Sequence, residues 1–309
     1  MRICSARISC ACALVAGIVV ADAKAQLVVG STSTTAGNPA AFYIDVTTNA
    51  QTPLWTQTSQ TNVNGLAGDN TNAKLYSNDA ARLNVWNYGA VGTTPTFIAG
   101  TYRTDGLGSF SATGADSLAW ANGKLYGAVS SANLGFQQFR GIYEINTTHD
   151  GAATPHCIMT PVYMNSFSTM NLGGLDFDPV LGEFIVTSTV DASSNGGPGI
   201  GIYAIDALND DSVTKIADFP AGELDWDGLA VGGGKYWLTD YQVGAPSLIK
   251  ILPFDPVSLT YGTMMTVSLT DASNRATGAT WAPNALPEPS SLAAIGLMSL
   301  VALRRRRLN

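Results

Sequence analysis

The sequence has few of the residues that enzymes use for nucleophilic or transition-metal chemistry. Its 309 residues include two histidines, His149 and His156, and four cysteines, and no Gly-x-Ser-x-Gly motif is present. His156 and Cys157 are neighbours in a predicted strand, where adjacent side chains point to opposite faces, so we do not expect a catalytic dyad. So few soft ligands also disfavour a transition-metal site.

Charged residues are scarce as well, at 13% of the chain, and the basic ones are concentrated at the two ends. Setting aside the seven basic and two acidic residues of the terminal segments leaves 9 basic and 21 acidic residues, a net charge of −12 for the body. An acidic body repels phosphate backbones. We therefore expect no nucleic-acid partner.

The first 25 residues have the features of a signal peptide. Arg2 and Arg7 form a positive segment, residues 8–20 are apolar, and the small residues Ala23 and Ala25 form a cleavage site before Gln26. Three of the four cysteines lie in this segment, so the exported body keeps only Cys157 and forms no internal disulfide. The alternative is an ordinary buried N-terminal helix.

Residues 285–309 have the features of a short membrane tail. It contains Pro287, Glu288 and Pro289, then an apolar run over residues 292–303. Four arginines follow: Arg304, Arg305, Arg306 and Arg307. The prolines end any preceding element, and the arginines stay on the cytoplasmic side. Residues 290–303 span about 21 Å as a helix, which is short for a hydrocarbon core of about 30 Å. A marginal anchor of this kind suits temporary tethering.

This order of Pro-Glu-Pro, apolar helix and arginine cluster resembles the PEP-CTERM sorting signal of Gram-negative bacteria that make exopolysaccharide. The resemblance covers residues 286–309 alone. It implies a transient stay in the inner membrane, handling by an exosortase-type membrane protease, and a final place at the cell surface or in the medium. The alternative is a permanent tail anchor that is not processed.

The body between these ends repeats itself with a period slightly above fifty residues. Each unit has Gly-Leu or Ser-Leu, a short gap, and then Lys or Glu followed by apolar or aromatic residues. The leucines are Leu66, Leu118, Leu175 and Leu229, spaced by 52, 57 and 54 residues. This period is the size of a propeller blade.

Two further strands are predicted after each such pair, because apolar and polar residues alternate with a period of two. The third strands are expected at residues 83–85, 142–145, 202–205 and 248–251. The fourth strands are expected at residues 96–99, 156–159, 214–217 and 262–267. No apolar stripe at helical spacing runs through the body, which indicates an all-β fold.

The two ends of the body complement each other. Residues 27–29, 42–45 and 53–55 match the second, third and fourth strands of a unit, and residues 278–281 match the first. We therefore predict a β-propeller of five four-stranded blades over residues 26–284, closed by N- and C-terminal strands, with terminal signal and membrane helices. A β-sandwich or a one-sided β-solenoid are alternatives, and extra strands near residues 86–113 and 188–200 leave six or seven blades open.

The remaining possibility for a functional site is one built from the oxygen atoms of aspartate side chains. Asp116 and Asp227 hold matching positions just before first strands, Asp225 is close to Asp227, and Asp176 and Asp178 follow the matching Gly174. We expect these carboxylates to cap turns, because an aspartate at a loop-to-strand junction reaches local backbone N–H groups. The alternative is that they converge on one face, because equivalent positions of a propeller ring its channel, and there they would suit Ca²⁺ or the paired acids of a glycosidase. No EF-hand-like calcium run is present, so no cofactor is assigned.

Recurrent strand aromatics, such as Tyr76, Tyr143 and Tyr203, fit packing between blades better than a carbohydrate platform. The expected function is that of an exported, non-enzymatic binding or structural propeller at the cell surface or in the matrix, with exopolysaccharide or another surface component as partner. The alternative is a five-bladed carbohydrate-active hydrolase that uses channel carboxylates.

Overall fold

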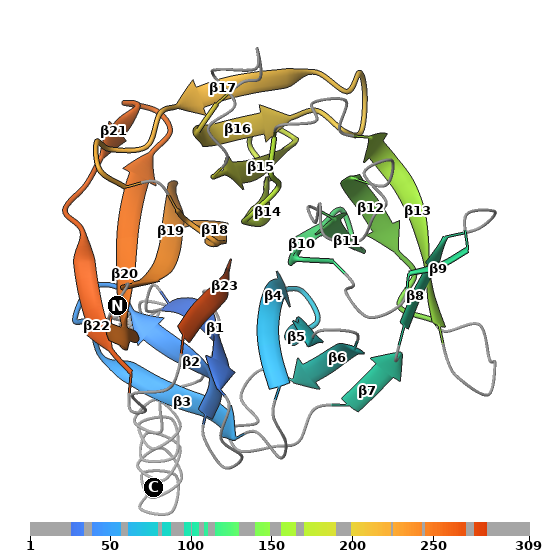
Figure 1. Ribbon diagram of the computed structural model, residues 1–309, viewed down its shortest axis with the longest axis horizontal. Helices are drawn as coiled ribbons and strands as arrows, with labels where there is room; N and C mark the ends of the chain where they lie inside the picture. Colours follow the sequence, from blue (N-terminus) through green and yellow to red (C-terminus); the bar gives the residue numbers. More distant parts are fainter. Residues whose placement is uncertain are drawn as a thin grey trace, which may run out of the picture. The chain divides into compact units, whose positions relative to one another are not determined.

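Short strands joined by tight turns build the whole body in the computed structural model (Figure 1). The structure describes residues 26–33, 39–56, 61–79, 82–87, 96–99, 101–104, 108–110, 115–129, 140–148, 156–164, 170–189, 199–223, 225–242, 245–269 and 275–282. All of them lie within one compact unit, Lys24–Pro287. This described part contains strands and no helix, and none of it is a helix able to cross a membrane.

The strands form five antiparallel blades around a ring, so the predicted five-bladed β-propeller is confirmed (Figure 1). From the axis outward, blade one is β4 (Thr61–Asp69), β5 (Lys74–Asp79), β6 (Arg82–Asn87) and β7 (Thr96–Ala99). Blade two is β10 (Ser117–Ala121), β11 (Lys124–Val129), β12 (Gly141–Ile145) and β13 (His156–Met164). Blade three is β14 (Leu175–Asp178), β15 (Glu183–Ser188), β16 (Gly201–Ile205) and β17 (Val213–Ala217). Blade four is β18 (Gly228–Gly232), β19 (Lys235–Gln242), β20 (Ala245–Asp255), β21 (Thr260–Tyr261) and β22 (Met265–Ser268).

Blade five combines the two ends of the body, as predicted. It consists of β23 (Arg275–Trp281), β1 (Gln26–Ser33), β2 (Pro39–Asp45) and β3 (Gln51–Thr56). The terminal strands pair antiparallel, with Leu27 opposite Trp281. A short pairing of β1 with β4 also joins this blade to blade one. Closing the ring in this way removes two sheet edges that would otherwise be exposed.

Two details differ from the predicted strands. The region of residues 86–113 adds no blade; it supplies β8 (Thr101–Thr104) and β9 (Gly108–Phe110), and β8 pairs parallel with β13 at the outer edge of blade two. The outer strand of blade four is divided into β21 and β22. Pro253 of β20 has no N–H that could donate to a neighbouring strand. Its carbonyl oxygen accepts the N–H of Gly262, which lies between β21 and β22, at 2.8 Å.

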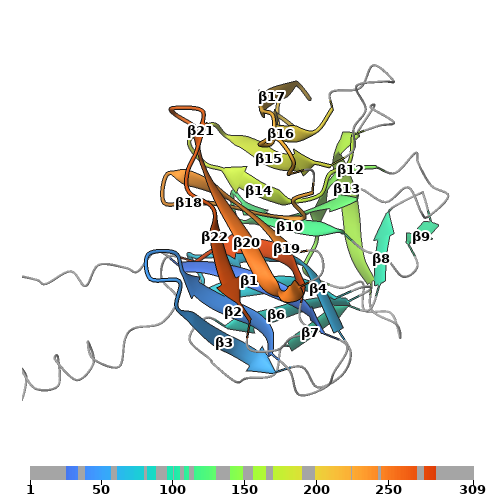
Figure 2. The same ribbon diagram turned by 60° about the vertical axis from the view of Figure 1, so that its left-hand side comes forward.

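The innermost strands β4, β10, β14, β18 and β23 run side by side around the axis (Figure 2). Their backbones approach closely at the repeated glycine position, which explains the Gly-Leu pattern. A Cβ added to Gly65 would lie 2.9 Å from the Ser117 Cα, and one added to Gly174 would lie 2.8 Å from the Leu229 nitrogen. A side chain at either position therefore pushes two blades apart.

Aromatic side chains pack between blades, as expected from their repetition. Tyr76 of blade one stacks on Trp120 of blade two with ring centroids 5.2 Å apart, and Trp237 of blade four stacks on Trp281 of blade five at 5.5 Å. The two pairs hold equivalent strand positions. Because most of these rings are buried, they supply hydrophobic area and not a sugar platform.

The ring has two different faces. We call one face the turn face, because the first and third strands of the blades end there in tight turns. These turns are residues 46–49, 70–73, 122–123, 179–182, 207–210, 233–234 and 256–259. The loop face is the opposite one, where the chain enters each innermost strand. It includes residues 115–116, 218–223 and 225–227.

Candidate functional site

Two aspartates occupy matching places on the loop face. Asp116 comes directly before β10 of blade two, and Asp227 comes directly before β18 of blade four. The equivalent residue of blade three, between them, is Gly173. A Cβ added to Gly173 would lie 3.1 Å from Thr187 Oγ1, so the glycine makes room for Thr187 of its own blade.

Each aspartate follows a residue that the preceding blade holds in place. Asn78 Nδ2 of blade one donates to the carbonyl oxygen of Ala115, and Thr187 Oγ1 of blade three donates to that of Trp226 at 2.7 Å. Asn78 and Thr187 are buried at equivalent positions of their second strands. Such buried hydrogen bonds fix the backbone beside each carboxylate. In the sequence these two anchors look like any other polar strand residue, and sequence reasoning missed them.

The electrostatics show that the three predicted carboxylates lie near one another. The pKa of Asp227 is raised to about 6, mainly by burial and in addition by the charge and hydrogen bond of Asp225 and by the charge of Asp116. A like charge beside a partly buried acid favours its protonated form. We name Asp116, Asp225 and Asp227 the acidic cluster. The structure brings these residues together, and their role as ligands stays a prediction.

The acidic cluster can share a proton and attract a cationic group, but its geometry does not define a metal site. Within the described residues, no three His, Cys, Asp or Glu side chains are grouped so that they could hold a metal ion.

Asp176 and Asp178 do not join the acidic cluster, so the alternative in which all five acids converge is wrong. Asp176 is buried between two blades, where its Oδ1 accepts the Phe177 N–H at 2.8 Å and its Oδ2 accepts the Val231 N–H of blade four at 2.7 Å. Thr280 holds the position of β23 that corresponds to Asp176 in β14. Its Oγ1 accepts the Gly68 N–H at 3.0 Å and so joins blade five to blade one. Asp176 therefore acts as a latch between the innermost strands.

Asp178 instead belongs to a turn that recurs on the turn face. Its Oδ1 accepts the N–H groups of Val180 at 2.8 Å and Leu181 at 3.3 Å, while its Oδ2 accepts the Tyr236 hydroxyl at 2.7 Å. Aspartates at the same place in other turns accept the N–H groups two and three residues on; they are Asp45, Asp69 and Asp255. Each of these four turns ends in a residue with positive φ, namely Asn49, Ala73, Gly182 and Leu259. Turn capping is thus the role of these aspartates.

Cys157 is fully buried in the core of blade two, which fits a packing role. His149 and the side chain of His156 lie outside the described residues. The sorting motif of Pro287, Glu288, Pro289 and the four arginines also lies outside them, as do residues 1–25. The signal peptide and the membrane tail accordingly stay predictions.

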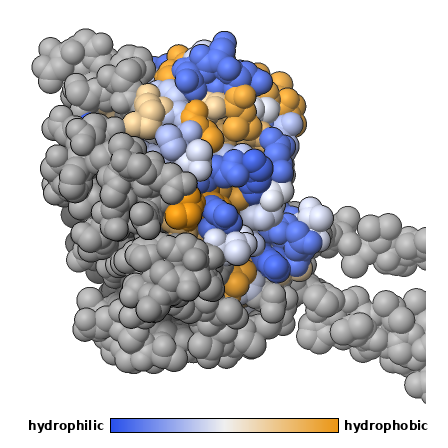
Figure 3. Space-filling view, turned by 90° about the vertical axis from the view of Figure 1, so that its right-hand side faces the viewer, coloured by the Kyte–Doolittle hydropathy of each residue, from blue (hydrophilic) through white to orange (hydrophobic). Residues whose placement is uncertain are grey.

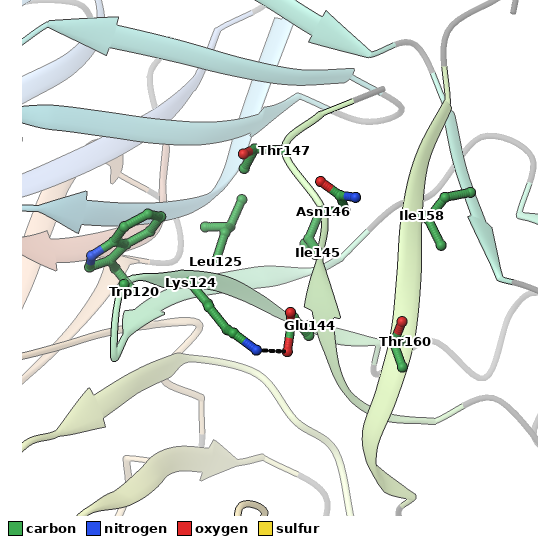
Figure 4. Close-up of a pocket in the computed structure, with 10 residues that line it drawn as sticks. Trp120, Lys124, Leu125, Glu144, Ile145, Asn146, Thr147, Ile158 and Thr160 are labelled. Carbon is green, nitrogen blue, oxygen red and sulfur yellow. Dashed lines mark hydrogen bonds and ion pairs between the residues drawn. The ribbon is translucent and has the colours of Figure 1, made fainter. Parts of the chain in front are cut away.

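Blade two carries a pocket of about 350 Å³ at its turn-face end, which sequence reasoning did not predict (Figure 4). Trp120, Leu125 and Ile158 line it together with polar side chains. Lys124 Nζ and Glu144 Oε2 form an ion pair at 2.8 Å along one side. Because the two charges of this ion pair offset each other, the pocket has no strong preference for an anionic or a cationic ligand.

The described surface on the side of blade two mixes hydrophilic and hydrophobic residues without one continuous apolar area (Figure 3). Such a surface is typical of a solvated protein.

Neither a protein-family model nor a curated protein matches the chain.

Solved structures match the fold at low identity. A chain of a nidogen–laminin complex is 13% identical with a TM-score of 0.47, covering 84% of this chain and 99% of the other. TolB from Acinetobacter baumannii is 12% identical with a TM-score of 0.49, over 84% and 67% of the two chains. A putative 6-phosphogluconolactonase from Bacteroides fragilis is 12% identical with a TM-score of 0.45, over 85% and 99%. At this identity the likeness concerns the fold alone.

Proposed function

We propose that this chain is an exported propeller that serves as a non-enzymatic binding or structural module at the cell surface or in the extracellular matrix. The observation that carries the proposal is that all described strands of the closed ring lie between Gln26 and Trp281. Gln26 is the first residue of β1, and Ala282, next to the end of β23, donates its N–H to the Gln26 carbonyl oxygen at 3.0 Å. Removal of residues 1–25 and cleavage after residue 284 would therefore both leave the closed ring complete.

The proposed route has three steps. The signal peptide directs export through the inner membrane, the tail of residues 285–309 holds the chain there transiently, and an exosortase-type protease acts at Pro287, Glu288 and Pro289. The prolines keep this segment extended and accessible to a protease. Arg304, Arg305, Arg306 and Arg307 resist being pulled through the bilayer.

Processing is tested by replacing Pro287, Glu288 and Pro289 with alanine in the native host. We expect export to continue and the full-length chain to stay in the inner membrane, whereas deletion of residues 292–309 should release the protein unsorted. Mass spectrometry of the surface form decides between the alternatives. An intact C-terminus carrying Arg304–Arg307 on that form would contradict sorting and leave a plain tail anchor.

A binding role is favoured by how the body uses its carboxylates. The buried aspartates Asp176 and Asp178 are committed to structural hydrogen bonds, Asp178 in a turn and Asp176 between two blades. The acidic cluster offers a negative, rigidly held patch on the face that carries the longer connections, where binding sites are usually found. Exopolysaccharide or another surface component is the proposed partner.

The test is a glycan array and an exopolysaccharide pull-down with residues 26–284, compared with a variant in which Asp116, Asp225 and Asp227 are all asparagine. We expect specific capture by the parent, weakened in the variant. A hydrolase is the alternative, because an acid with its pKa raised to about 6 can serve as a proton donor. Release of shortened oligosaccharides by the parent, abolished in Asp227→Asn, would establish that alternative.

A further inference from the structure

One turn of blade two carries the acceptor sequence for N-linked glycosylation. Asn146, Thr147 and Thr148 follow directly after β12 and form an Asn-x-Thr sequence. No other Asn-x-Ser or Asn-x-Thr sequence is present in the 309 residues of the chain. The structure exposes both Asn146 and Thr148 on the turn face, where a transferase can reach them.

Asn146 occupies a place where three other blades have an aspartate. The turns after the third strands begin with Asp206 in blade three, Asp255 in blade four and Asp45 in blade five. Asp45 Oδ1 accepts the Thr47 N–H at 2.9 Å, and Asn146 Oδ1 accepts the Thr148 N–H at the same distance. Because an oxygen suffices to cap such a turn, the fold makes no use of the amide nitrogen of Asn146.

The contacts of Asn146 leave that nitrogen accessible. The backbone N–H of Asn146 donates to the Ile158 carbonyl oxygen at 2.9 Å, which joins the start of the turn to β13. The side-chain Nδ2 donates to none of the residues that the structure describes. Asn146 is thus held by its backbone and its side-chain oxygen, and the atom that N-glycosylation modifies is the unused one.

The pocket of blade two offers space for a sugar beside this nitrogen. Asn146 and Trp120 line it from opposite sides (Figure 4). Trp120 is only partly buried, whereas Trp281, which holds the same strand position in blade five, is 8% exposed. An indole ring beside hydroxyl groups and an ion pair combines apolar contact with hydrogen bonding, and a sugar ring needs both.

We propose that Asn146 is a site of N-linked glycosylation and that the first sugar of the glycan covers the pocket of blade two. The donor is an oligosaccharide linked to a lipid diphosphate. Asn146 Nδ2 forms a bond to the anomeric carbon, the bond from that carbon to the diphosphate oxygen breaks, and the lipid diphosphate leaves. The amide gives up one proton to a base of the transferase. This inference rests on the export in the proposed function, because Asn-x-Thr is an acceptor in secreted proteins.

Mass spectrometry of the protein purified from its native host tests the modification. We expect the mass of an oligosaccharide on Asn146 of the exported form. Asn146→Asp removes the nitrogen and keeps the turn cap, as Asp45 shows, and Thr148→Ala breaks the acceptor sequence. Both variants should be exported without the glycan. Thr147→Ala leaves the acceptor sequence intact and is the matched control, which should keep the glycan.

Lysine acetylation tests where the glycan lies. Lys124 lines the pocket, and Lys74 is exposed at the same strand position of blade one. We expect Lys124 to react at least about threefold more slowly in the glycosylated parent than in Asn146→Asp, because a ligand seated in a pocket covers most of its lining. Lys74 should react at the same rate in both. Equal rates for Lys124 would refute the placement of the sugar over the pocket.

Two results separate this inference from the proposed function. An exported form that has lost residues 1–25 but carries no glycan on Asn146 would overturn the inference and leave the proposed function intact. A chain that keeps residues 1–25 and stays in the cytoplasm would refute export and, with it, both proposals.

Discussion

Asp176 should make the stability of the propeller fall as the pH rises through neutrality. Asp176 is 8% exposed, and its carboxyl lies between the innermost strands of blades three and four. Burial outweighs the hydrogen bonds from Val231 and Phe177, which lower the pKa, and with a smaller contribution from the charge of Asp178 the pKa is raised from 3.8 to about 7. The folded protein thus binds the Asp176 proton more tightly than the unfolded chain does.

The sign and size follow from that difference. Between about pH 4 and pH 7 the folded state holds a proton that the unfolded state has lost, so the free energy of unfolding decreases with rising pH. Three pKa units correspond to about 4 kcal/mol, and this is an upper figure because the site can relax. The contribution is complete below pH 4 and absent above about pH 8.

Asp176→Asn removes this titration while keeping the shape of the side chain. At pH 5 we expect the variant to be less stable than the parent by about 1–3 kcal/mol, since one backbone N–H loses its acceptor. At pH 8.5 the parent buries a charge and the variant does not, so between pH 5 and pH 8.5 the difference between them should shrink by up to about 3 kcal/mol or reverse. Urea titrations followed by tryptophan fluorescence measure both values.

Asp255→Asn is the matched control on an exposed turn. Hydrogen bonds from Ser258 and Val257 lower the pKa of Asp255, so its contribution is lost only as the pH falls through the acid range. Its difference from the parent should be constant between pH 5 and 8.5. If the Asp176→Asn difference is equally constant over that range, the reasoning about the buried latch is refuted.

Three other predictions concern the ring and its loop face. Deleting residues 26–55 removes three strands of blade five and should give an insoluble or molten protein; cooperative unfolding at the parent's temperature would show that the termini do not close the ring. Gly174→Ala should cost about 2 kcal/mol or more in thermal unfolding because its Cβ meets the Leu229 backbone, whereas Gly222→Ala, with open space but a φ of 88°, should cost about 1 kcal/mol. Adding Ca²⁺ or EDTA should leave the melting temperature unchanged; a saturable rise with Ca²⁺ that Asp227→Asn abolishes would show a cation site in the acidic cluster.

The sequence by itself determined the blades and their order. Alternation with a period of two is a local property, and the Gly-Leu repeat marks the close approach of innermost strands, so both are visible without a structure. The match between the two ends of the body was enough to predict ring closure. Turn capping was also foreseeable, because an aspartate reaches backbone N–H groups only two and three residues away.

Only the tertiary structure decided which carboxylates meet. Asp116 and Asp227 are in blades two and four, and the influence of one charge on the other depends on how the blades are arranged around the ring. Asp176 follows the matching glycine in the sequence, but in the structure its carboxylate accepts the Val231 N–H of the next blade. The parallel pairing of β8 with β13 was hidden for the same reason. Contacts between distant segments depend on packing of the whole ring, and no local pattern of residues records them.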